Sequence, residues 1–205
     1  MVGRRSVKFK YLLWFTTNMK SVVTIKIRIP FNKLLLETMK QYSNAISYIA
    51  DKGFETKTYN RYKLHHLCYY EAKDKFNLPS QFIINANRVA SQTLKSVRTN
   101  KGSKPVFKEH MPLDFDKRTF TFSFDKGRLT TIDGRVDIPI EVPEYYWKYL
   151  DWNYQTMLVT IDKDNRMFLN ITFSRDVKTQ QISNRLQLGV DVGINHIAVT
   201  SNRQF

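Results

Sequence analysis

A strand and three helices are predicted in the first half of the chain. Apolar and polar residues alternate from Ser21 to Ile29, the period of a strand with one buried face, and Pro30 ends it. The apolar spacing then changes to three and four residues, which is typical of helices. These helices are expected over Lys33–Lys52, over Tyr59–Phe76 and after Leu78-Pro79-Ser80.

Two residues are expected to set helix ends. Gly53 follows the first helical stripe, and glycine commonly ends helices because it adopts left-handed conformations. Ser80 precedes the third stripe, where its hydroxyl can cap the first turn. The buried positions of the third helix are small or aliphatic: Ile83, Ala86, Ala90, Leu94 and Val97.

Short strands are predicted after the loop at residues 101–105, where the period becomes two. A turn at Asp133-Gly134 separates two of them, and Thr156–Ile161 is expected to form a hairpin with Met167–Phe173. The first strand is expected to join these later strands. We therefore predict an α+β fold, an antiparallel barrel-like β domain with a three-helix lobe inserted at about residues 31–100.

The charge balance favours a polyanionic partner. The chain has 205 residues, with 33 Lys and Arg against 18 Asp and Glu, a formal charge of +15. Ribosomal and membrane-surface proteins also carry such a charge, so the class of partner must be inferred from sequence motifs. Cys68 is the only cysteine, which excludes an intrachain disulfide and a four-cysteine zinc site and fits a reducing, cytoplasmic setting. The apolar run Tyr11–Phe15 is too short for an export signal or a membrane span.

The third helix and the loop after it contain the best candidate track for a phosphate backbone. No acid occurs between Ile84 and Lys108, and backbone binding requires several cations without base reading. An ordinary solvated face is the alternative. The candidate cations are Arg88, Lys95, Arg98, Lys101, Lys104 and Lys108. Five aromatic residues are candidates for stacking on bases, although such residues more often belong to a core: Phe107, Phe115, Tyr145, Tyr146 and Trp147.

An acidic residue lies between two glycines near the end of the chain. In a strand over residues 188–193, Gly189, Asp191 and Gly193 share the face opposite Leu188, Val190 and Val192. Ile197 and Val199 lie on a second strand that can pair back. The missing side chains leave room for a metal ion and a phosphate backbone beside Asp191. A core strand with a solvated carboxylate is the alternative.

The run from Leu188 to Thr200 resembles the first RuvC motif of the TnpB family, transposon-encoded RNA-guided nucleases. The resemblance extends from about Lys20 to the end of the chain through several short segments in the family's order: Leu78–Gln81, Lys104–Lys108, Leu113–Phe122 and Val136–Ile140. We expect four regions. The strand pattern that starts just after Met19 indicates an upstream extension at 1–18, with Met19 as an alternative start, and the polar, aperiodic residues indicate a linker at 176–186. The resemblance implies a wedge-like β domain at 19–175 carrying the helical lobe and the first strands of an RNase H-like RuvC domain at 187–205.

The resemblance also implies chemistry and partners. The whole protein would bind a guide RNA and a target DNA, with neither a membrane partner nor a small-molecule substrate, and cleave the DNA with Mg²⁺ ions. Asp191 would be a catalytic, metal-binding carboxylate. The family's further acids and its zinc ribbon would lie downstream of Phe205, so we expect that this chain alone does not cut DNA.

Two rival functions are considered. Actin-like and sugar-kinase ATPases also place an Asp-x-Gly strand in an RNase H-like fold, but they need small hydroxyl or glycine residues after it, where this chain has Ile194-Asn195-His196. A non-catalytic RNA- or DNA-binding module, or a decayed transposase fragment, stays open.

Overall fold

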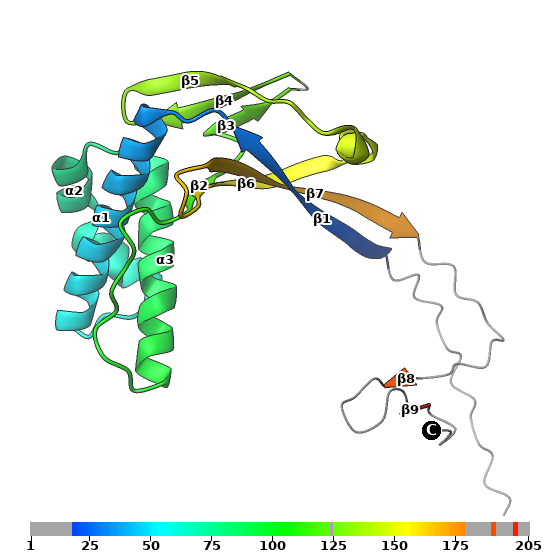
Figure 1. The fold of residues 1–205 in the computed structure, drawn as a ribbon. Coiled ribbons are helices and arrows are strands. Elements are labelled where there is room, and N and C mark those ends of the chain that lie inside the picture. The colour runs from blue at the N-terminus through cyan, green and yellow to red at the C-terminus, as the bar shows by residue number, and fades with distance from the viewer. Residues whose placement is uncertain (1–17, 124, 179–189, 192–198, 201–205) are drawn as a thin grey trace, which may run out of the picture. The chain divides into compact units, whose positions relative to one another are not determined.

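The computed structural model describes residues 18–123, 125–178, 190–191 and 199–200. The chain divides into two compact units, Ser21–Arg175 and a second that combines Met1–Lys20 with Asp176–Phe205. The larger unit is mixed α+β with antiparallel sheets, as predicted from the sequence (Figure 1). In the described part of the chain, no helix has both the length and the apolar character needed to cross a bilayer.

Three helices follow the first strand, β1 (Asn18–Ile29), and pack against one another. They are α1 (Lys33–Glu55), α2 (Arg61–Phe76) and α3 (Ser80–Thr99). Asn32 caps α1 by accepting from the N–H groups of Leu34 and Leu35 at 2.9 and 3.0 Å, and Asn60 caps α2 in the same way. The three predicted helices are therefore confirmed, with small shifts at their ends.

Both residues expected to set helix ends were misassigned. Gly53 does not end α1: it is buried within the helix, where a Cβ would lie 2.5 Å from Leu94 Cδ1 and 2.9 Å from Leu64 Cδ1. A larger residue here would press on side chains of the two other helices, because the three helices meet at this point. Ser80 is the first residue of α3 and makes no capping hydrogen bond, because Pro79 occupies the cap position.

Two antiparallel sheets make up the rest of the larger unit. The first has the order β1-β7-β6-β2, with β2 at Leu113–Phe115, β6 at Asn153–Ile161 and β7 at Met167–Lys178. The second has the order β3-β4-β5, with β3 at Phe120–Phe122, β4 at Lys126–Thr131 and β5 at Gly134–Pro139. A 3₁₀ helix, η1 (Glu144–Tyr149), precedes β6. The prediction that the first strand joins the later ones is confirmed.

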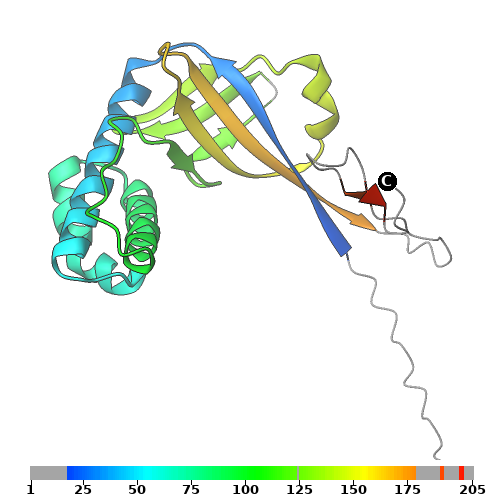
Figure 2. The same cartoon turned by 60° about the horizontal axis from the view of Figure 1, so that its bottom comes forward.

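The two sheets face each other across an apolar core (Figure 2). Phe120 on β3 packs edge-on against Tyr154 on β6, with ring centroids 6.1 Å apart, and Phe122 contacts Phe173 on β7 at the same distance. Alternate residues of β1, β6 and β7 point into this core, as their period of two predicted. The helical lobe reaches the second sheet through Thr38, whose Oγ accepts from the N–H of Ile132 at 3.3 Å.

The smaller unit contains one described ladder. β8 (Val190–Asp191) pairs antiparallel with β9 (Val199–Thr200), so that Asp191 lies opposite Val199. The predicted hairpin is confirmed at these four residues. β7 continues to Lys178, so residues 176–178 of the predicted linker are part of a strand, as is residue 18 of the predicted upstream extension. The remainder of those two segments lies outside the described residues.

Candidate nucleic-acid interface

Arg88 is held against the sheet. Its guanidinium forms an ion pair and a hydrogen bond with the carboxylate of Asp114 on β2, and the two side chains are 36% and 18% exposed. Burial raises the pKa of Asp114, while the nearby guanidinium lowers it. Asp114 lies on a strand that is distant from α3 in sequence. The acid-free sequence around Arg88 therefore gave no indication of this partner. Arg88 is therefore paired with an acid, and a phosphate contact at this residue stays a prediction.

Lys104 also has an acidic partner. The loop after α3 runs beside α1, where Lys104 Nζ lies 3.0 Å from Asp51 Oδ1. Further along, Ser43 of α1 donates a hydrogen bond to the carbonyl of Lys108, and Lys40 pairs with Glu109 at 3.5 Å. These three contacts attach the loop to α1. The charge of Lys104 is largely compensated.

The other four candidate cations are exposed and form no ion pair with any acid in the described parts of the chain. Lys95 and Arg98 lie on α3, and Lys101 and Lys108 lie on the loop after it. The guanidinium of Arg98 stacks over the ring of Tyr59, 5.2 Å from its centroid, which restrains the side chain and leaves its charge uncompensated. We call these four residues the basic surface: Lys95, Arg98, Lys101 and Lys108.

A hollow of about 270 Å³ between α2 and α3 was missed by the sequence analysis. It is lined by Arg61, Tyr62, His65, Ile84 and Asn87. The Nδ2 of Asn87 donates to the carbonyl of Arg61 at 3.0 Å, which ties the two helices together at its base. Burial, and next the neighbouring His66, lower the pKa of His65, so its ring is neutral at pH 7. One feature of the sequence could have indicated this hollow: the second predicted helix is rich in aromatic residues.

The candidate stacking residues divide into core and surface. Phe115 is fully buried and belongs to the core, and Phe107 is partly buried against it. Tyr145 and Trp147 on η1 are 64% and 49% exposed, and Tyr146 is half-buried. Among these five candidates, those on η1 are therefore the ones that present their rings to solvent.

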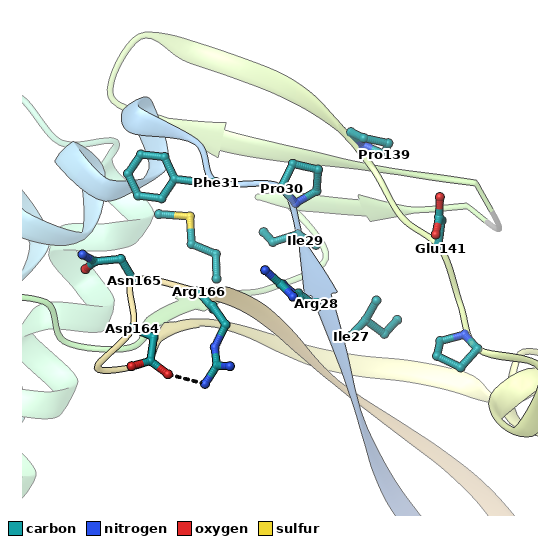
Figure 3. Close-up of a pocket in the computed structure, with 12 residues that line it drawn as sticks. Ile27, Arg28, Ile29, Pro30, Phe31, Pro139, Glu141, Asp164, Asn165 and Arg166 are labelled. Carbon is teal, nitrogen blue, oxygen red and sulfur yellow. Dashed lines mark ion pairs between the residues drawn. The ribbon is translucent and has the colours of Figure 1, made fainter.

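A larger hollow of about 560 Å³ lies beside the ends of β1 and β5 and the turn between β6 and β7 (Figure 3). Both basic and acidic residues line this hollow. Arg28 and Glu141 line it, and Arg166 is neutralised by Asp162 at 2.7 Å and Asp164 at 2.6 Å. This mixture does not favour a polyanion, so we assign no nucleic-acid contact to it.

The predicted metal ligand, Asp191, lies in β8. Gly189 and Gly193, the glycines on either side of it, lie outside the described residues. Within the described ranges, no three His, Cys, Asp or Glu side chains come close enough together to hold a metal ion.

Comparison of the sequence with protein-family models and with curated proteins finds no match.

Proposed function

We propose that this chain is the nucleic-acid-binding N-terminal part of a transposon-associated, RNA-guided DNA endonuclease similar to the TnpB family. The observation that carries the proposal is the basic surface. Lys95, Arg98, Lys101 and Lys108 are exposed and lack acidic partners among the described residues, whereas Arg88 and Lys104 nearby are paired. Cations left uncompensated on a chain of net charge +15 suit a phosphate backbone.

The order of the elements supports the same proposal. A helical lobe follows β1, and the chain then returns to complete the sheet that contains β1. This is the order that the resemblance implies for a recognition lobe inserted into a wedge-like barrel. In the proposal, the larger unit binds guide RNA and target-adjacent DNA, and the segment around Asp191 begins a RuvC domain.

In this proposal the chain binds nucleic acid but does not cleave DNA by itself. In RNase H-like nucleases, Mg²⁺ ions held by several carboxylates activate water and stabilise the leaving oxygen. Asp191 is the one metal ligand in the segment that resembles the RuvC motif. We therefore assign no hydrolytic step to this chain alone.

The test is crosslinking of the chain to RNA in the cells that encode it, followed by sequencing of the crosslinked RNA. A guide-binding protein should enrich one structured RNA species far above its cellular abundance. Recovery of many unrelated RNAs in proportion to their abundance would contradict the guide-binding proposal and favour a nonspecific basic module.

A further inference from the structure

Helix α2 has an aromatic side that faces solvent. Tyr62 is 77% exposed and Tyr70 is 80% exposed, values that are unusual for residues on a helix packed against a core. The ring of His65 lies 4.6 Å from that of Tyr69, and Tyr69 contacts Tyr70 at 5.3 Å. We call the five residues on this side the aromatic face: Tyr62, His65, His66, Tyr69 and Tyr70.

The aromatic face occupies one continuous side of the helix. Counting about 100° per residue, its five members lie within a sector of about 140° beside the buried stripe that contains Leu64 and Cys68. Lys73 lies in the same sector. The two acids of α2, Glu71 and Asp74, lie outside it, and Glu71 accepts a hydrogen bond from Tyr48 on α1.

Cations outnumber acids around the aromatic face: Lys73 lies within its sector, Arg61 and Lys63 lie beside it, and Asp74 is the acid beside it. Arg61, Lys63 and Lys73 are exposed, and none forms an ion pair with an acid in the part of the chain that the structure covers. Aromatic rings next to uncompensated cations suit single-stranded nucleic acid, because bases stack on the rings while the cations attract the backbone.

The hollow between α2 and α3 adjoins the aromatic face, because Tyr62 and His65 belong to both. Its volume of about 270 Å³ lies just below the roughly 300–1,000 Å³ of pockets that take drug-sized ligands, so it suits one planar ring. The neutral ring of His65 lines this space, and Ile84 supplies an apolar contact from α3.

We propose that the aromatic face binds unpaired bases of single-stranded RNA, with one base entering the hollow beside Tyr62 and His65. This inference rests on the proposed nucleic-acid-binding function and deepens it. The basic surface contacts the backbone of any nucleic acid, whereas the aromatic face distinguishes unpaired bases from a duplex.

The test measures binding of the 205-residue chain to three fluorescent probes: a short oligouridine, an abasic oligomer of the same length and an RNA duplex. The variant Y62A/Y70A removes two exposed rings and should weaken oligouridine binding by about ten-fold or more, since stacking on one aromatic residue is worth about 1–3 kcal/mol. Its affinity for the abasic oligomer and the duplex should not change.

The control is Y62F/Y70F, which keeps both rings and should bind oligouridine like the parent chain. Circular dichroism of each variant establishes that the helices are retained.

The outcomes separate this inference from the proposed function. If the parent chain binds all three probes and Y62A/Y70A binds oligouridine equally well, the aromatic face serves another class of partner and this inference fails alone. An equal loss on all three probes would also overturn it, because the rings would not be reading bases. If the parent chain binds no probe, the proposed function fails with it.

Discussion

Arg88 on α3 and Asp114 on β2 form an ion pair that joins the helical lobe to the four-stranded sheet. Asn85, on the preceding turn of α3, donates from Nδ2 to the carbonyl of Asp114 at 3.0 Å. The helix thus contacts both the side chain and the backbone of an edge strand. This pair fixes the lobe to the sheet, which is a structural role for a cation that its helical position had marked as a phosphate contact.

Replacing Arg88 by Ala should lower the free energy of unfolding by about 1–2 kcal/mol, because the Asp114 carboxylate would remain partly buried without its partner. Urea denaturation measures this change. The matched control is Lys95→Ala on the same helix, which removes an exposed cation without an ion pair and should change stability by less than about 0.5 kcal/mol. Equal stability of the two variants would contradict the structural role.

The stability of the Arg88→Ala variant should depend on pH through Asp114. Burial raises the pKa of this carboxyl above its ordinary value of 3.8, and Arg88 opposes that rise, so the pKa increases further in the variant. A raised carboxyl pKa favours the folded chain at acid pH, and this contribution is lost as pH rises from 3.8 through the folded pKa. The variant should therefore lose stability over that window relative to Arg88→Ala/Asp114→Asn. A pH-independent difference would rule this out.

The sequence pattern predicted the helices and strands more accurately than it predicted the contacts between them. The spacing of Ile83, Ala86, Ala90 and Leu94 identified the buried side of α3, because helical period reports directly on burial. The partners of Arg88 and Lys104 lie on β2 and α1, and no local pattern reports an acid brought near by tertiary folding. The position of Gly53 inside the helix could not be predicted for the same reason, since Leu64 and Leu94, which lie close to it, belong to other helices.

If the proposed function is correct, the purified chain should not cleave DNA in the presence of Mg²⁺, because a two-metal site needs several carboxylates and the proposal assigns only Asp191 to it. Incubation of supercoiled plasmid with the chain and Mg²⁺, followed by gel electrophoresis, measures this directly. The control is Asp191→Ala, which should behave identically in the same assay. Robust Mg²⁺-dependent cleavage by the parent chain that disappears in Asp191→Ala would show that this chain forms a complete nuclease site.

In the proposed function the basic surface binds a phosphate backbone, and the salt dependence of RNA binding measures this contact. The variant K95Q/K101Q/K108Q removes three exposed cations that form no ion pair within the described ranges. The control K40Q/K104Q/R128Q removes three cations that are each paired with an acid, so both variants change the net charge equally.

Each phosphate contact on single-stranded RNA contributes about 0.7 to the slope of log K against log salt concentration, so the first variant should reduce the slope by about 2 in magnitude. The control should change it much less, because its cations are already compensated by Glu109, Asp51 and Asp137. An unchanged slope for K95Q/K101Q/K108Q, or an equal reduction in both variants, would contradict the assignment of the basic surface.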